Sequence, residues 1–136
     1  MEVCILGNNL TSLTLAKTLV NQGIYVDIFS TNYNQRIDKN RTLGISKKNI
    51  DFFNKNILNI DKLLWDIDKI EIYSENLNDK KILNFTDVEK LFSIIKNKEL
   101  IEHLLTKLKK DKLCKFKKVK ISNNLIEQDY KLIINC

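Results

Sequence analysis

The chain has 136 residues, with no proline, three glycines, three cysteines and one histidine. Cys4, Cys114 and Cys136 are odd in number and lie far apart, so neither a disulfide framework nor the paired spacing of a structural zinc site is expected. We interpret them as reduced thiols of a cytosolic protein. A Ser-His-Asp or Cys-His hydrolase would depend on His103 alone, so we expect no metal ligands and name no catalytic residue.

The chain also lacks a long apolar run. No stretch approaches the ~18 residues that a transmembrane helix needs. The N-terminus does not resemble a signal peptide, because Glu2 replaces the positive first region and Asn8 and Asn9 interrupt the apolar stretch. With 43% hydrophobic and 29% charged residues, the composition is typical of one globular, cytoplasmic domain with a real core.

Arginine is scarce, with 2 arginines against 21 lysines, and the net charge is +6. Residues 96–120 hold ten of the lysines and three acidic residues, a local balance of +7. Ten lysines could neutralise nucleic-acid phosphates, but Phe116 is the main aromatic residue between them and arginine is absent from the stretch. We therefore expect no specific nucleic-acid partner. Peripheral contact with the anionic inner face of a membrane stays open.

The first 30 residues have the order of a βαβ unit. Glu2–Leu6 is an apolar strand that ends at Gly7, and apolar residues recur at helical spacing from Leu10 to Val20. Gly23 stops this helix, and Tyr25–Phe29 is a second β-rich run. The helix is long enough for a right-handed crossover, so the two strands should be parallel neighbours.

The rest of the chain alternates helices and short strands. Residues 31–40 read as a loop, 46–56 as a helix, 60–65 as a short helical turn and 97–109 as an amphipathic helix. The segments 69–75, 81–85 and 91–95 read as short strands of a small antiparallel sheet layered on the parallel one. The final run, 130–136, is continuously apolar and predicts a parallel strand buried on both faces. The predicted fold is α/β, Rossmann-like, in a single domain over 1–136.

The turn between the first strand and helix, "GNNLTS", departs from the three-glycine dinucleotide pattern. Gly7 occupies the first glycine position. Asn9 occupies the second, where its tolerance of positive φ would help, and Ser12 occupies the third, where a small side chain still allows close packing. The helix start keeps the free amides of Leu10 and Thr11 and a positive dipole end, so the turn can bind phosphate. An ordinary strand-to-helix turn is the alternative.

The residue that ends the second strand is a further test of a dinucleotide site. An acidic side chain usually stands there and bonds the ribose hydroxyls. Here the residue is Ser30, which can make a weaker hydrogen bond, while Asp27 faces elsewhere.

Several later segments add to this pattern in order: "NRTLGISKKNIDFF", "LLW", "KIEIYS", "LFSIIKNKELIEHLLTKL" and "YKLIINC". The series resembles the FAD-dependent aromatic-ring hydroxylases, and most of all the ubiquinone-biosynthesis hydroxylases. In that family an arginine with small and apolar residues follows strand two, a tryptophan precedes a strand, and a late strand leads into Ala-Asp-Gly. The resemblance implies FAD as cofactor and NAD(P)H as co-substrate.

The resemblance also implies roles for individual residues. It puts the turn in contact with the FAD pyrophosphate, Ser30 at the ribose, Arg41 near the flavin phosphates and the backbone of Val119 at the adenine. The alternatives are an exposed, solvated charge for Arg41 and a plain core residue for Val119. Trp65 is expected to pack beneath the sheet, and His103 to lie on the exposed or half-buried side of its helix.

The implied function is hydroxylation of an aromatic ring of a ubiquinone precursor. The departures from the family are the missing turn glycines, the missing acidic residue and the absence of the later flavin-wrapping segment and the substrate domain. We therefore expect the N-terminal third of such an enzyme, from a truncated reading frame or an incomplete sequence, that does not catalyse alone. A non-catalytic nucleotide-binding fragment or degenerate module is the alternative, and the oligomeric state is open.

Overall fold

The structure, a computed structural model, describes residues 2–30, 41–77, 80–86, 92–118 and 130–136. Its elements run in the order β1 (Glu2–Leu6), α1 (Leu10–Asn21), β2 (Tyr25–Ser30), β3 (Thr42–Ser46), α2 (Lys47–Asn56), η1 (Asp61–Leu63), β4 (Leu64–Ile67), β5 (Lys69–Ser74), η2 (Glu75–Leu77), β6 (Lys80–Thr86), β7 (Phe92–Lys96), α3 (Asn97–Lys109), β8 (Cys114–Lys118) and β9 (Leu132–Asn135).

Four strands form a parallel sheet in the order β8-β2-β1-β9. β1 and β2 are side by side in continuous register, from Glu2 opposite Tyr25 to Leu6 opposite Phe29. The predicted βαβ unit is therefore confirmed. The chain builds outward from β1 through β2 to β8 and then returns to place β9 on the other side of β1. The strand order thus reverses between β1 and β9, which is the point where open α/β sheets bind their ligands.

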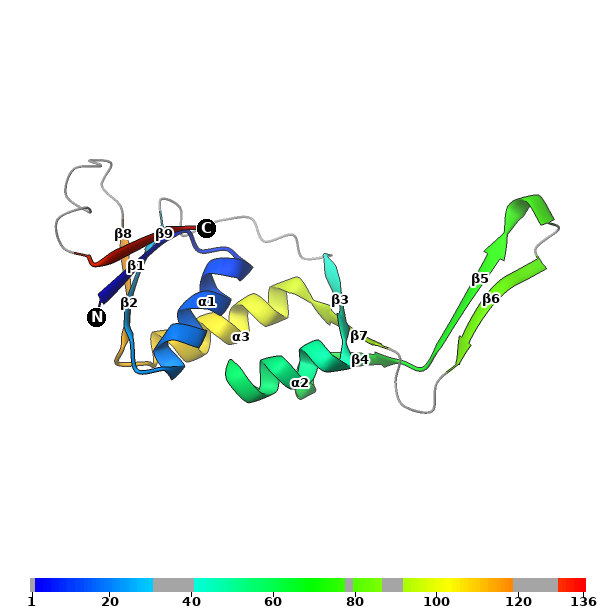
Figure 1. Ribbon diagram of the computed structural model, residues 1–136, viewed down its shortest axis with the longest axis horizontal. Coiled ribbons are helices and arrows are strands. Elements are labelled where there is room, and N and C mark those ends of the chain that lie inside the picture. The colour runs from blue at the N-terminus through cyan, green and yellow to red at the C-terminus, as the bar shows by residue number, and fades with distance from the viewer. Residues whose placement is uncertain (1, 31–40, 78–79, 87–91, 119–129) are drawn as a thin grey trace.

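The main core lies between this sheet and two helices, α1 and α3, which pack against one another and cover one face of it (Figure 1). Alternate residues of β2 point into the core, because successive side chains in a strand face opposite ways. The sheet and the helices meet through fully buried aliphatic side chains, among them Val3, Ile5, Val26, Ile28, Leu13, Ala16, Leu104 and Leu108. This packing holds α1 against the face of the sheet, and the start of the helix follows the carboxyl end of β1.

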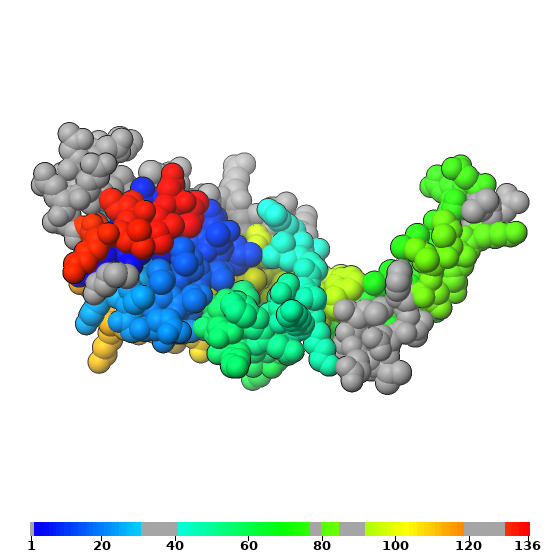
Figure 2. Space-filling view, in the orientation of Figure 1, coloured from blue at the N-terminus to red at the C-terminus, as the bar shows by residue number. Residues whose placement is uncertain are grey.

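The antiparallel strands form two separate sheets where the sequence indicated one. β3, β7 and β4 form a three-stranded sheet, and β5 and β6 form a hairpin of their own. The hairpin extends away from the body of the protein instead of being layered on the parallel sheet (Figures 1 and 2). It exposes about half of Ile72, Tyr73, Ile82 and Leu83. β3 was not predicted, because its partner β7 lies some fifty residues further along the chain.

Both predicted later helices are confirmed. α3 covers the predicted residues, and α2 begins directly after Ser46, whose hydroxyl caps the helix by accepting a hydrogen bond from the Asn49 amide at 3.3 Å. The predicted helical turn over 60–65 is limited to η1, after which the chain enters β4. His103 is half-buried, as expected.

Two burial predictions were wrong. The final strand, β9, is an edge of the parallel sheet as described, and Leu132 is 46% exposed, so this strand is not buried on both faces. Trp65 is 62% exposed instead of packing beneath a sheet. Its neighbour in β4, Leu64, packs against the core, so Trp65 points the opposite way. The ammonium group of Lys96 lies 5.0 Å from the centre of its ring.

Candidate functional site

The turn after β1 requires glycine at position 7 for two reasons. Its φ is +129°, a conformation open to glycine, and its amide donates to the Phe29 carbonyl at 2.8 Å. In addition, a β-carbon placed on Gly7 would lie 2.4 Å from the carbonyl oxygen of Cys136. Cys136 is held there by its own amide, which donates to the Leu6 carbonyl at 2.9 Å. The tight turn was predicted, whereas the close approach of the residue after β9 was not.

α1 begins with a side-chain cap. Asn9 has φ −78° and ψ 178°, so the positive φ considered for it is not used. Its Oδ1 instead accepts a hydrogen bond from the Ser12 amide at 3.0 Å, and the Ser12 hydroxyl donates back to the Asn9 carbonyl at 2.8 Å. Ser12 is fully buried, so the prediction of a small residue in close packing is confirmed.

The start of α1 therefore offers two amides to an anion. The N–H groups of Leu10 and Thr11 have no acceptor within a helix, because the first turn of any helix lacks preceding carbonyls. The third such amide, that of Ser12, is occupied by Asn9. The helix dipole adds partial positive charge at the same place. These groups lie at the reversal point between β1 and β9, so position and chemistry both favour binding of a phosphate group there.

The ends of the neighbouring strands lie along the same edge. Ser30 ends β2, is 7% exposed, and is in register with Lys118 at the end of β8. Lys118 was missed from the sequence as a candidate residue. The strand periodicity of "KFKK" could have pointed to it, because residues two apart share a face and Lys118 therefore lies on the face of Phe116, opposite to Lys117. The ribose role of Ser30 stays a prediction.

Arg41 stands directly before β3 and is exposed, and its carbonyl accepts from the Asn97 amide at 3.0 Å. In Figure 1 the start of β3 lies on the same side of the molecule as the start of α1. The contact of its guanidinium with flavin phosphates stays a prediction. Val119, expected at the adenine, lies outside the described residues.

Asp27 faces away from the helices, on the other face of the sheet, as expected. Its carboxylate is 2.6 Å from the Lys117 ammonium and accepts a hydrogen bond from the Tyr130 hydroxyl at 2.5 Å. The Asp27 carboxylate raises the pKa of Lys117, and burial together with the bond to Asp27 raises the pKa of Tyr130. This carboxylate therefore joins β2, β8 and the segment before β9, and it is already engaged by two partners.

Two of the three cysteines, Cys4 and Cys114, have buried thiols. Burial raises the pKa of Cys114 to about 12 and also raises that of Cys4, so both thiols stay protonated near neutral pH. Within the described part of the chain, His, Cys, Asp and Glu residues form no group of three or more that could hold a metal ion.

No family model and no curated protein matches the sequence. Solved structures do match the fold. p-Nitrophenol 4-monooxygenase PnpA from Pseudomonas putida aligns with a TM-score of 0.68 at 12% identity, over 85% of this chain and 31% of that one. A protein from Photorhabdus luminescens described as an FAD-containing monooxygenase gives 0.64 at 20%, over 85% and 30%.

HpxO from Klebsiella pneumoniae, solved in complex with FAD and uric acid, gives a TM-score of 0.66 at 12% identity, over 85% of this chain and 30% of that one. At these identities the likeness shows the fold alone. The predicted α/β, Rossmann-like fold is confirmed as that of the FAD-binding domain of monooxygenases. The chain spans about 30% of the length of these proteins.

Proposed function

We propose that the start of α1 binds the diphosphate of FAD, and that the chain is the FAD-binding N-terminal portion of a flavin-dependent monooxygenase acting on an aromatic ring. One observation carries the proposal: the Leu10 and Thr11 amides stand at the reversal point of a sheet whose fold is that of FAD-binding domains.

The groups present fit a diphosphate. Gly7 turns the chain so that the helix start faces the carboxyl edge of the sheet, and the Leu10 and Thr11 amides would donate to phosphate oxygens. Ser30 would bond the ribose, and Arg41 would neutralise the diphosphate from the start of β3. When bound, FAD supplies the redox chemistry by accepting electrons from NAD(P)H and activating oxygen. The chain itself binds and orients.

The identity of the aromatic substrate is a more detailed proposal than FAD binding and has separate support. The sequence resemblance supports a ubiquinone precursor, whereas the solved structures of similar fold name p-nitrophenol and uric acid, so the fold alone leaves the ring open. A quinone precursor is lipid-soluble, which would suit a cytoplasmic protein whose lysine-rich residues 96–118 touch an anionic membrane. None of the helices in the described ranges has the length and apolar character needed to cross a bilayer.

Titration of the chain with FAD, followed by flavin fluorescence, tests the proposal. We expect saturable binding of one FAD per chain. Leu10→Pro removes one amide donor at the first helical position, where proline is tolerated, and we expect about tenfold weaker binding. Leu10→Ala keeps the amide while also losing the leucine side chain, so it is the matched control, and we expect it within about twofold of the parent. Circular dichroism confirms that both variants fold. A chain that binds no FAD contradicts the proposal.

The second candidate is a nucleotide-binding module without chemistry. The observation in its favour is the Asn9 side chain, which occupies an amide that a glycine would leave to the phosphate. Both candidates predict that the 136 residues with added FAD do not oxidise NADPH. Turnover of NADPH by this chain would contradict both. A downstream reading frame that begins near Asp-Gly would favour the monooxygenase over the degenerate module.

A further inference from the structure

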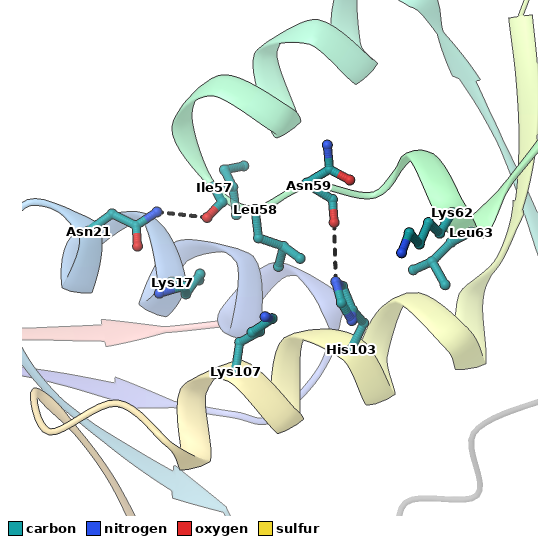
Figure 3. A pocket seen from close by; sticks show the side chains of 9 residues that line it. All are labelled: Lys17, Asn21, Ile57, Leu58, Asn59, Lys62, Leu63, His103 and Lys107. Carbon is teal, nitrogen blue, oxygen red and sulfur yellow. Dashed lines mark hydrogen bonds between the residues drawn. The ribbon is translucent and has the colours of Figure 1, made fainter.

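A second candidate site lies along the other half of α1. A pocket of about 420 Å³ opens between α1, the α2–η1 segment and α3. Lysines from all three parts of the fold line it, namely Lys17, Lys62 and Lys107, and His103 is a further lining residue (Figure 3). Ile57, Leu58 and Leu63 form its apolar wall, and the first two are at most 9% exposed. The volume is within the range of small-molecule sites.

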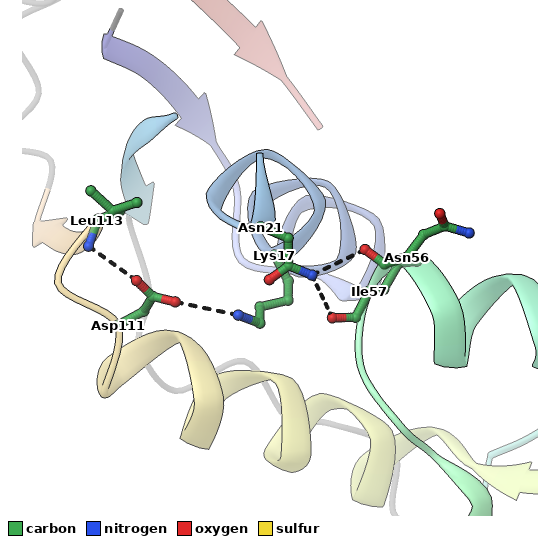
Figure 4. A network of polar contacts seen from close by, with 6 residues as sticks. All are labelled: Lys17, Asn21, Asn56, Ile57, Asp111 and Leu113. Atoms are coloured by element: carbon green, nitrogen blue, oxygen red, sulfur yellow. Dashed lines mark hydrogen bonds and ion pairs between the residues drawn. The ribbon is translucent and has the colours of Figure 1, made fainter. Parts of the chain in front are cut away.

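The three walls are tied to one another by hydrogen bonds. The Asn21 side-chain amide on α1 donates to the Asn56 carbonyl at 3.0 Å and to the Ile57 carbonyl at 2.7 Å (Figure 4). His103 Nε2 lies 3.1 Å from the Asn59 carbonyl, and because a carbonyl oxygen only accepts, this nitrogen carries the proton. These bonds join α1 and α3 to the same segment, so the pocket is formed before a ligand arrives.

A third tie neutralises one of the lysines. The ammonium group of Lys17, whose side chain is 14% exposed, is 3.3 Å from an Asp111 carboxylate oxygen, and the other Asp111 oxygen accepts from the Leu113 amide at 3.1 Å (Figure 4). Lys17 and Asp111 therefore add no net charge to the pocket. Their role is to join α1 to the segment between α3 and β8.

Two lysines remain uncompensated. Among the residues that the structure describes, neither Lys62 nor Lys107 takes part in an ion pair or side-chain hydrogen bond. They come from η1 and α3, and in Figure 3 the Lys62 nitrogen is turned to the side on which His103 lies. The nearby Asp61 carboxylate accepts from Asn54 at 2.6 Å and from Asn59 at 2.8 Å and does not line the pocket. The pocket thus presents two positive charges beside an apolar wall.

We propose that this pocket binds a phosphate monoester, with the dianion between Lys62 and Lys107 and the organic part against Leu58 and Leu63. A monoester carries close to two negative charges at neutral pH, which matches two free ammonium groups. Lysine binds phosphate as a point charge and needs no fixed fork geometry. The site is separate from the start of α1, because Lys17 and Asn21 belong to the second half of that helix.

The test is an amide-resolved NMR titration of the full chain with phenyl phosphate at constant ionic strength. We expect saturable shifts at Lys62, His103 and Lys107. The double variant Lys62→Gln/Lys107→Gln should bind at least tenfold more weakly. Lys109→Gln removes the same charge from an exposed position on α3 outside the pocket, and should stay within twofold. FAD affinity should stay within twofold of the parent in every variant. The phosphate-monoester proposal can therefore fail while the proposed FAD-binding function still holds.

Either of two results overturns the proposal: shifts confined to residues 7–12, or an equal loss of affinity in the double variant and in Lys109→Gln. A parallel sedimentation assay with vesicles containing phosphatidic acid identifies the source of the monoester. Co-sedimentation that the double variant abolishes indicates a lipid headgroup, and binding of phenyl phosphate without co-sedimentation indicates a soluble metabolite.

Discussion

The two halves of α1 offer anions two different kinds of site. At its start the helix has no charged residue in the first turn and presents backbone amides and a dipole. In its second half, Lys17 and Asn21 line a pocket whose free charges are the side chains of Lys62 and Lys107. The first site is fixed by backbone geometry and strand order. The second depends on two exposed side chains that line one pocket between three hydrogen-bonded walls.

This difference indicates which kind of change should weaken ligand binding at each site. Backbone amides are not removed by ordinary side-chain substitutions, so the first site should respond to changes that move or block the backbone. Ammonium groups are removed by single substitutions and screened by salt, so the second should respond to charge. The following experiments separate the two sites on these grounds.

The largest effect is expected at the corner that positions the first site. Gly7→Ala introduces a β-carbon against the Cys136 carbonyl in a backbone conformation that alanine avoids, so we expect a loss of about 3 kcal/mol of unfolding free energy or failure to fold. Gly23→Ala, with φ +76° and open space around it, should cost about 1 kcal/mol. Gly44→Ala meets ordinary contacts and should change stability by less than about 0.5 kcal/mol. Urea unfolding of the three variants measures the order.

Asn9 controls how many amides the first site offers. Asn9→Gly releases the Ser12 amide, so we expect FAD binding to strengthen by roughly threefold while stability falls by a few tenths of a kcal/mol. Asn9→Asp keeps the cap but adds a negative charge beside the diphosphate, and we expect binding to weaken about tenfold. Titration by flavin fluorescence measures both. If glycine and aspartate have the same effect, Asn9 does not border the diphosphate.

Salt should affect the two sites unequally. Raising NaCl from about 50 mM to about 500 mM shortens the screening length severalfold, so binding of phenyl phosphate at Lys62 and Lys107 should fall about tenfold. FAD binding through amides, with Arg41 as its one expected cation, should fall by less than about threefold. The comparison uses the same protein sample for both ligands. Equal salt dependence would show that both ligands are held mainly by side-chain charge.

The smallest expected effect is a pH dependence of the unfolding free energy, which comes from charged and polar side chains on the parallel sheet. Asp27 raises the pKa of Lys117, and burial together with the bond to Asp27 raises the pKa of Tyr130, so the folded state holds these protons more tightly than the unfolded chain. The stabilisation is complete below the unfolded values near 10.0 and 10.5 and is lost as pH rises above them. Because Lys117 is 45% exposed, we expect a loss of only about 0.5 kcal/mol. Unfolding of the parent and of Lys117→Met across this range checks it, since the variant should lose the Lys117 part of this dependence.

The sequence predicts well the parts of the fold that local patterns determine. The β1-α1-β2 unit has helical and strand periodicities separated by Gly7 and Gly23, and α3 has an unbroken amphipathic pattern. β3 could not be found in this way, because its five residues gain their partner only when β7 arrives from far along the chain. The separation of the β5–β6 hairpin from the three-stranded sheet likewise depends on pairing, which residue patterns do not specify.

The candidate site also combines features that local sequence predicts with features that depend on packing between distant segments. Gly7 and Ser12 were predicted from their spacing, but the approach of Cys136 to Gly7 depends on β9 returning beside β1. The cap made by Asn9 was overlooked because the residue was considered as a substitute for glycine instead of as a helix start. The pocket combines residues 17–21, 57–63 and 103–107, which only the packing of α1 and α3 brings together.

The most direct test of the account is an amide NMR map of the 136-residue chain titrated with FAD. We predict that the largest shifts fall on Gly7, Leu10 and Thr11, with Ser30 next, and that Lys62 and Lys107 move little. Shifts centred on Lys62 and Lys107, or no saturable shifts at the start of α1, would contradict the claim that these backbone amides hold the diphosphate of the flavin nucleotide.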